Sequence, residues 1–239
     1  MSGDLMHPDR RGRSRRREDL ERDRLFELTR DMLCVSGFDG VFRQVNPAFE
    51  RALGHPLAEL KSKPFIEFVM PEDRKRSLEE FRRVRGGAET VTFENRFLHA
   101  DGSYRWLQWN ATTDPEHEVI YGVARDITER KSQEAELARL ASVVASSNDA
   151  IIGMSLHGVV EHWNPAAEDI FGYPGYEMHD KPLSLLIPPG HVDHLPQILD
   201  SIRRGQRIAH YETIRRRKDG AVINVSLTVS PVRDAAGHI

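Results

Sequence analysis

The sequence repeats itself at a constant offset of 118 residues. The repeated residues are Asp31, Gly40, Asn46-Pro47-Ala48, Gly54, Glu59, Lys63-Pro64 and Asp101-Gly102 in the first copy, and Asp149, Gly158, Asn164-Pro165-Ala166, Gly172, Glu177, Lys181-Pro182 and Asp219-Gly220 in the second. Solenoid repeats have periods of roughly 20–50 residues, so a period this long indicates two copies of one domain with equal element lengths.

The composition excludes several classes of protein. The chain has 239 residues, which fits two domains of about 100 residues with a leader and a linker. A net charge of −3 predicts no nucleic-acid partner. Cys34 is the single cysteine of the sequence, so no internal disulfide is expected, which is typical of a cytoplasmic protein. No apolar run reaches the length of about 18 residues that a membrane span needs.

Four segments are predicted along the chain. They are a disordered basic leader (1–18), a first domain with an N-terminal helix (19–130), a helical linker (131–146) and a second domain (147–239). On the N-terminal helix, Leu25, Leu28 and Met32 have the spacing of one helix face. The second copy stops at Ile239, where its final strand is due by analogy with the first. We therefore expect this copy to lack that strand, and Ile239 to be a fragment boundary.

Local signals predict the elements of the first copy. Asn46 and Pro47 are typical of a helix start, with Phe49 and Leu53 on its inner face and Gly54 at its end. The expected strands span 34–36, 41–45, 90–98, 104–113 and 119–126, with short helical turns over 57–68 and a longer helix from 71 to 84. This order predicts an α+β fold with an antiparallel sheet.

Strand alternation predicts which side chains line the interior. The inner-face residues are Val91, Phe93, Leu107, Trp109 and Ala111 in the first copy, and Ala209, Tyr211, Ile223, Val225, Leu227 and Val229 in the second. Tyr104 and Trp106 are expected on the outer face of the first sheet, where exposed aromatic residues suit a helix or a partner protomer. The basic run from Arg215 to Lys218 is expected to be a solvated hairpin turn.

The linker is predicted to be a helix because residues 129–146 contain no glycine or proline. Leu137, Leu140 and Val144 have a 3-4 spacing on it. Two interpretations remain open: the helix packs on its own domain, or it forms a short parallel seam between two copies of the chain. In the second case we expect a homodimer that forms through the N-terminal helix and the linker helix.

Taken together, these landmarks resemble the PAS family of sensory domains. The resemblance covers roughly residues 22–130 and 140–239. It is carried by Asn-Pro-Ala after a two-strand hairpin, by a glycine at the following helix end, by an Asp-Gly turn between late strands, and by Asp126-Ile127-Thr128-Glu129-Arg130-Lys131. The turn Arg217-Lys218-Asp219-Gly220 matches the family's basic form, whereas His99-Ala100-Asp101-Gly102 keeps its last two residues only. The resemblance implies a five-stranded antiparallel sheet with helices over one face in each complete domain.

The resemblance also implies a role in signalling. Such a module senses a ligand or dimerises, and passes the signal through helices to an output domain in the same polypeptide, in the first place a histidine kinase. Asp126 and Thr128 lie where the last strand meets the exit helix and are the expected relay residues. A ligand-free dimerisation or interaction module and the input region of a cyclic-di-GMP enzyme remain open as well. No catalytic motif is found in the sequence.

The cofactor is left open. The light-sensing branch of the family has a reactive cysteine on a short central helix, but here the stretches are Leu60-Lys61-Ser62-Lys63 and Met178-His179-Asp180-Lys181. The haem branch uses a histidine near the long helix, for which His191 and His194 are the candidates. Non-covalently bound flavin, a small metabolite and an empty apolar pocket also stay open. No histidine pattern predicts a metal site, and Cys34 is expected to be a small core residue.

Overall fold

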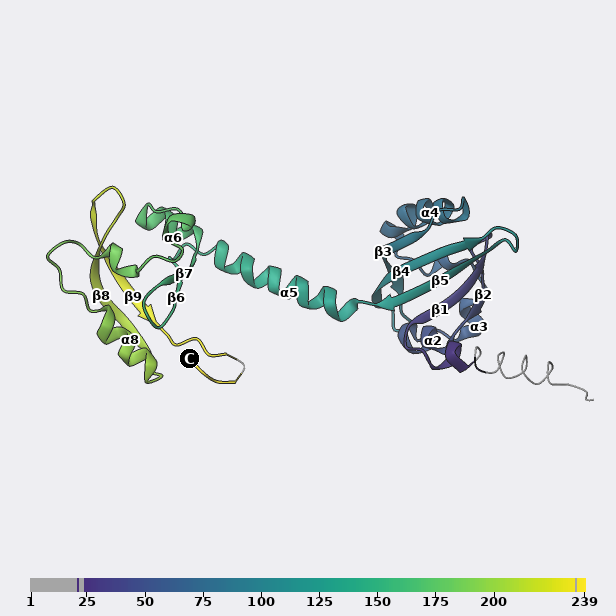
Figure 1. Cartoon of the computed structure of the whole chain (residues 1–239), viewed down its shortest axis with the longest axis horizontal. Helices are drawn as coiled ribbons and strands as arrows, with labels where there is room; N and C mark the ends of the chain where they lie inside the picture. Colours follow the sequence, from purple (N-terminus) through teal and green to yellow (C-terminus); the bar gives the residue numbers. More distant parts are fainter. Residues whose placement is uncertain (1–20, 22–23, 235) are drawn as a thin grey trace, which may run out of the picture. The chain divides into compact units, whose positions relative to one another are not determined.

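The computed structural model describes residues 21, 24–234 and 236–239, so the predicted basic leader lies outside the described residues. The chain divides into two compact units that meet at Glu134 and Ala135. This boundary lies within helix α5 (Thr128–Ala145), which confirms the predicted linker helix and extends it by three residues at its start (Figure 1).

The first unit contains one five-stranded antiparallel sheet with the order β2-β1-β5-β4-β3 (Figure 1). Its strands are β1 (Met32–Gly37), β2 (Phe42–Val45), β3 (Thr90–Leu98), β4 (Tyr104–Asp114) and β5 (Val119–Asp126). All five strands were predicted from hairpin signals and alternation. The last strand, β5, lies at the centre of the sheet between β1 and β4.

Helices between β2 and β3 pack against this sheet. They are α2 (Pro47–Leu53), α3 (Leu57–Leu60), η1 (Phe65–Glu67) and α4 (Pro71–Arg85). The predicted inner face of α2 is confirmed, because Phe49 and Leu53 are fully buried in one core with Phe97 and Leu107. Gly54 ends α2 with a φ of 70°, a left-handed conformation that glycine adopts without strain.

One buried asparagine fixes the start of each domain. The Asn46 side chain accepts a hydrogen bond from the Leu33 amide (2.9 Å) and donates to the carbonyls of Phe26 and Asp31 (3.0 Å each). Asn164 makes the same three bonds at an offset of 118, to Ile151, Val144 and Asp149. The repeated asparagine therefore ties the preceding helix to the first strand in both copies.

The N-terminal helix ends earlier than predicted. Helical structure is described for residues 21 and 24–28, and Leu25 and Leu28 are exposed. Met32 is not on this helix, because it lies on β1 and is buried. The Asn46 side chain holds the carbonyls of both Phe26 and Asp31, and this closure turns the chain out of the helix and into the strand.

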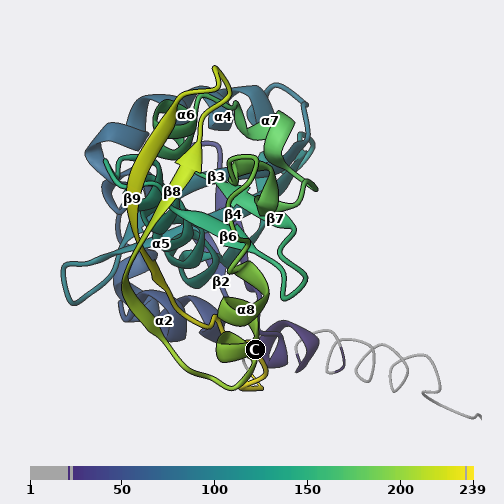
Figure 2. The ribbon, with the colours of Figure 1, turned by 90° about the vertical axis from the view of Figure 1, so that its left-hand side faces the viewer.

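The second unit repeats the first but is partial, as predicted (Figure 2). Its elements are β6 (Ile152–Met154), β7 (Val160–Trp163), α6 (Pro165–Phe171), α7 (Gly175–Met178), η2 (Leu183–Leu186), α8 (Leu195–Arg203), β8 (Ile208–Arg216) and β9 (Val222–Val229). They give two separate two-stranded sheets, β6-β7 and β8-β9. In the first unit β5 joins the counterparts of β6 and β9, and no described strand of the second unit takes that place.

A bulge at the start of β3 and β8 corrects two predicted inner-face residues. Thr92 (φ 60°) and His210 (φ 53°), again 118 residues apart, interrupt the strand register. The alternation therefore fails at the bulge: Thr90 is buried, whereas Val91 is 70% exposed and Ala209 is exposed. On β9, the strand that pairs with β8, the predicted alternation is confirmed.

Candidate ligand cavity and helix junction

A small cavity lies between α4 and the inner face of the first sheet. Its volume is about 80 Å³. The wall is largely aromatic, formed by Phe42, Phe65, Phe81, Phe93, Phe97 and Trp109. Pockets for drug-sized ligands have volumes of roughly 300–1,000 Å³, so this cavity accommodates a molecule of a few heavy atoms.

The polar groups on the cavity wall already have partners. The Asn95 amide donates to the Ser77 hydroxyl (3.0 Å), and the Trp109 indole N–H donates to Asn95 Oδ1 (2.8 Å). Because these buried groups are hydrogen-bonded to one another, they need no hydrogen-bond partner on a ligand. The cavity therefore suits a small and mostly apolar molecule. Asn95 was not identified as a cavity residue from the sequence. A polar residue at an inner strand position, between Phe93 and Phe97, is unusual and could have indicated it.

An ion pair lies where α4 leads into β3 beside the cavity. The Arg83 guanidinium donates two hydrogen bonds to the Glu80 carboxylate (2.6 and 2.9 Å) and one to the Glu89 carbonyl (2.7 Å). Thr90 also donates to Glu80. The Arg83 hydrogen bonds lower the pKa of the Glu80 carboxyl. This wall of the cavity is therefore charged but internally neutralised.

Cys34 is a core residue, as predicted. Burial raises the pKa of its thiol to about 12, so the group is neutral at physiological pH. Gly122 lies opposite on β5, and a Cβ at that position would come within 2.8 Å of Cys34 Sγ. This close approach explains why residue 122 is a glycine.

The predicted cavity residues are distributed over several places. Phe93 and Trp109 line the cavity of the first unit, and Leu107 is buried in the core. Leu227 lines a larger cavity in the second unit, and Val225 packs against that unit's core. Tyr211 is half-buried and contacts His194 edge-on, at 6.2 Å between ring centroids.

The two candidate haem ligands lie outside both cavities. His191 is exposed in the loop before α8, and His194 is exposed at the residue preceding that helix. Neither side chain lines the cavity of its domain. In the described part of the chain, no group of three or more potential metal ligands comes together.

The predicted relay residues lie at the junction of β5 and α5. Asp126 Oδ1 accepts a hydrogen bond from the Thr128 amide (2.8 Å), and Thr128 Oγ1 accepts one from the Trp106 amide (2.9 Å). The Ile127 amide donates to the Trp106 carbonyl (2.9 Å), and Ile127 itself is buried. The start of α5 is thus fastened to β4 through Ile127 and Thr128.

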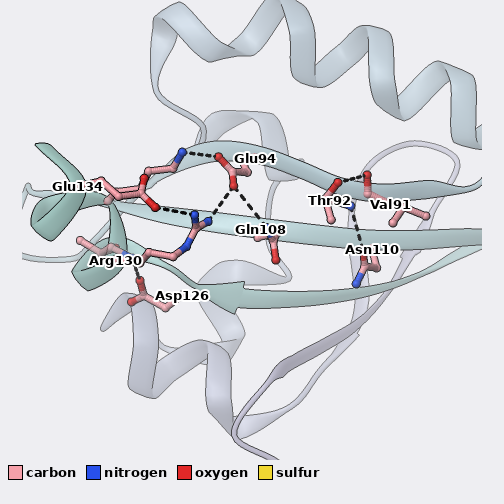
Figure 3. A network of polar contacts seen from close by, with 10 residues as sticks. Val91, Thr92, Glu94, Gln108, Asn110, Asp126, Arg130 and Glu134 are labelled. Carbon is pink, nitrogen blue, oxygen red and sulfur yellow. Dashed lines mark hydrogen bonds and ion pairs between the residues drawn. The ribbon is translucent and has the colours of Figure 1, made fainter. Parts of the chain in front are cut away.

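Glu94 is a second anchor for α5 that the sequence did not reveal (Figure 3). Its carboxylate contacts Arg130 (3.0 Å) and Lys131 (2.7 Å) in the first turn of α5, and it accepts a hydrogen bond from Gln108 (3.3 Å). The Lys131 ammonium holds the pKa of the Glu94 carboxyl below its usual value. One signal was present in the repeat, because Glu212 occupies the matching position at offset 118.

Strand β3 connects the cavity to this junction. Successive side chains of a strand point to opposite faces. Phe93 and Asn95 accordingly line the cavity, and Glu94 between them reaches α5. Strand β3 therefore carries both residues of the cavity wall and a residue that contacts α5. No helix of the described residues has the length and apolarity for crossing a membrane.

Comparisons with known proteins agree with this architecture. A PAS-fold family model matches residues 42–124 and a second PAS-fold model matches residues 138–239. Sensor protein FixL of Bradyrhizobium diazoefficiens is 28% identical over 134 residues, which are 52% of this chain and 26% of FixL. The probable diguanylate cyclase DgcE of Escherichia coli is 25% identical over 123 residues, which are 49% of this chain and 11% of DgcE.

The chain thus spans about a quarter and about a tenth of the lengths of these two relatives. Among solved structures, a domain of a sensory box sensor histidine kinase/response regulator from Geobacter sulfurreducens is 23% identical with a TM-score of 0.42, covering 46% of this chain and 94% of that domain. The two family matches follow one another along the chain and cover both copies of the repeat. The chain therefore belongs to the PAS family and carries two PAS domains in tandem.

Proposed function

We propose that this chain is a cytoplasmic sensory input region in which the state of the first-domain cavity sets the position of α5. The observation that carries the proposal is the alternation along β3, with Phe93 and Asn95 in the cavity wall and Glu94 between them in contact with α5. A ligand that changes the packing of β3 shifts the balance between two arrangements of α5. Asp126 and Thr128 hold the other side of the same junction.

Filling the cavity tests this coupling without a known ligand. Ala111 lines the cavity, so Ala111→Leu overpacks it and pushes on β3. We expect the amides of Ile127 to Lys131 to exchange with solvent about fivefold faster, equivalent to ~1 kcal/mol of local opening free energy. Hydrogen–deuterium exchange followed by mass spectrometry measures this change.

Two variants serve as controls for this measurement. Thr112→Leu adds similar bulk at an exposed position of the same strand and should leave the exchange at α5 unchanged. Glu94→Gln removes the charge that holds Arg130 and Lys131, so adding Ala111→Leu to it should cause no further change at α5. If Ala111→Leu folds and α5 exchanges as in the unaltered chain, the ligand-free interaction module becomes the better description.

The output domain we propose first is a histidine kinase in the same polypeptide. The similarity to the relative described as a sensor protein supports an input role, whereas the similarity to a probable diguanylate cyclase supports a cyclic-di-GMP output. Incubating the full-length gene product with labelled ATP and with labelled GTP distinguishes a histidine kinase from a diguanylate cyclase. Autophosphorylation on histidine supports the kinase, and formation of cyclic-di-GMP overturns it.

We also propose that α5 forms a parallel seam with a second copy of the chain. Leu137, Leu140 and Val144 are exposed on one stripe of this helix, and exposed apolar stripes at this spacing suit coiled-coil contacts. Leu140→Glu should therefore weaken association at least about tenfold in sedimentation equilibrium, since it buries a charge in the seam. Ser142→Glu places the same charge away from the stripe and should have little effect. Unchanged association of Leu140→Glu would rule out this seam.

A further inference from the structure

A buried histidine, His55, lies in the turn between α2 and α3 of the first domain. Only 8% of it is exposed, and its ring meets the Phe68 ring in an edge arrangement with 5.2 Å between centroids. Its Nδ1 lies 3.1 Å from a carboxylate oxygen of Glu59 on α3, and its Nε2 lies 3.2 Å from the Leu98 carbonyl oxygen. Leu98 is the last residue of β3, so the ring links α3 to a strand that lines the cavity.

Both groups that the ring contacts are hydrogen-bond acceptors, because a backbone carbonyl and an ionised carboxylate have no proton to donate. The hydrogen bond from His55, and after it the one from Lys63, holds the pKa of the Glu59 carboxyl below its usual value, so Glu59 is ionised above about pH 5. An imidazole with one proton donates to only one of the two acceptors, whereas an imidazolium donates to both. The charged ring therefore fits this site, and the neutral ring leaves one buried nitrogen facing an acceptor.

Other charged groups near His55 come from the end of α3 and from the β3–β4 hairpin. Lys63 shares the same carboxylate (3.2 Å), and its charge opposes a charge on the ring. The His99 ring lies beside Gly54, where a Cβ would come within 3.1 Å of it. Asp101 lies 2.9 Å from Nδ1 of His99 and favours a charge on that second ring. A test of His55 must therefore separate its titration from that of His99.

The second copy of the repeat has a permanent charge at the matching place. Glu177 matches Glu59 at offset 118. Tyr173 stands in the place of His55, and Lys218 of the late hairpin supplies the cation, 2.6 Å from the Glu177 carboxylate. A lysine keeps its charge up to about pH 10, whereas a histidine loses it between about pH 5 and 8. The first domain thus has a titratable cation where the second domain has a permanent one.

We propose that His55 makes the first domain responsive to pH, as a link between α3 and β3 that is complete only when its ring is protonated. Loss of the proton releases one of the two contacts of the ring. The stabilisation from this link is therefore present at acidic pH and is lost as the pH rises through about 6 to 8. A proton is an input separate from a cavity ligand, so this inference goes beyond the proposed function and does not depend on it.

The amides of Leu98 and Ala100 report on this link. They donate to the carbonyls of Phe68 (2.7 Å) and Leu53 (2.8 Å), and so hold the end of β3 and the following residues against the helices. Hydrogen–deuterium exchange of the full chain at about pH 6 and about pH 8, corrected for the intrinsic exchange rate at each pH, measures their protection. We expect the protection factors of both amides to be about fivefold lower at the higher pH, because one contact of the ring is then lost.

Two variants should remove this pH dependence in different ways. His55→Gln has no titrating group, so the protection of the two amides should differ by less than about twofold between the two pH values. Glu59→Gln keeps the histidine, but the introduced amide can donate to the neutral ring or accept from the charged one, so the pH dependence should fall to the same level. The Glu59 side chain is 39% exposed, so this second variant leaves the buried core unchanged.

Two other histidine variants are the controls. His117→Gln changes an exposed ring on the β4–β5 turn, and His99→Gln changes the neighbouring ring, so both should keep the difference of about fivefold. Equal protection at both pH values in the unaltered chain would overturn the proposal, as would a difference that persists in His55→Gln or disappears in His99→Gln. If His55→Gln does not fold, persistence of the difference in Glu59→Gln overturns it instead.

Discussion

Asp73→Asn is expected to lower the free energy of unfolding of the first domain by about 2.5 kcal/mol at neutral pH. The buried Asp73 carboxylate accepts hydrogen bonds from the Arg96 amide (2.9 Å), Nε (2.9 Å) and Nη2 (2.8 Å). These bonds fasten the first turn of α4 to the edge of β3, where Met70 also donates to the Arg96 carbonyl (2.8 Å). The loss would loosen the helix that forms one wall of the cavity.

The effect should depend on pH in a defined direction. The hydrogen bonds from Arg96 lower the pKa of Asp73 from 3.8 to about 2. A carboxyl group whose pKa is lowered on folding contributes its full stabilisation above its unfolded pKa, and loses it as the pH falls toward the folded pKa. The difference between wild type and Asp73→Asn should therefore be constant from pH 7 to about 5 and shrink between about pH 4 and 2.

Urea unfolding followed by hydrogen exchange of first-domain peptides at several pH values measures this difference. Glu79→Gln is the matched control, because Glu79 is exposed on the same helix, and its effect should stay within about 0.5 kcal/mol. A constant difference between the variant and wild type down to about pH 2 would show that the carboxylate charge is not the source of the stability.

Asn46→Ala is expected to destabilise the first domain by about 3 kcal/mol. The side chain is fully buried, and its removal leaves the Leu33 amide and the Phe26 and Asp31 carbonyls without their partner. Each buried polar group that loses its partner costs about 1–3 kcal/mol, less where water replaces the bond. Because a small domain has a total stability of about 5–15 kcal/mol, this change alone should clearly lower the midpoint of its unfolding transition.

The repeat supplies the control for this variant. Asn164→Ala removes the same three bonds from the second domain, so exchange should accelerate in that domain and not in the first. Peptide-resolved hydrogen exchange of both variants assigns each effect to its own unit. A loss below about 1 kcal/mol for Asn46→Ala would indicate that water replaces the side chain at little cost.

Most of the fold was predictable because its signals are local. The Asn-Pro helix starts, the glycines after α2 and α6 and the Asp-Gly turns act within a few residues of themselves. Because these signals recur at one offset, they indicate two domains with the same order and lengths of elements. The N-terminal helix was overextended to Met32 because the bonds of Asn46, which close it, come from 15 to 20 residues away.

The site was predictable in part. Phe93 and Trp109 follow from simple alternation and line the cavity. Val91 was placed wrongly because the bulge at Thr92 shifts the phase, and a bulge leaves no clear mark on a threonine in sequence. Glu94 was missed because its partner Arg130 lies 36 residues along the chain.

The sequence by itself determined the duplication, the element order, the PAS family and the partial second copy, since these depend on short-range backbone preferences repeated 118 residues apart. The tertiary structure alone decided which charges are buried and what they contact. In the sequence, Arg215 belongs to a basic run typical of a solvated turn, but β8 extends past it and the residue is buried. In the sequence, Glu94 is typical of a surface carboxylate, but in the structure it forms an ion pair with Arg130 of α5. Burial and ion pairing arise between residues that are distant in sequence, so no local pattern encodes them.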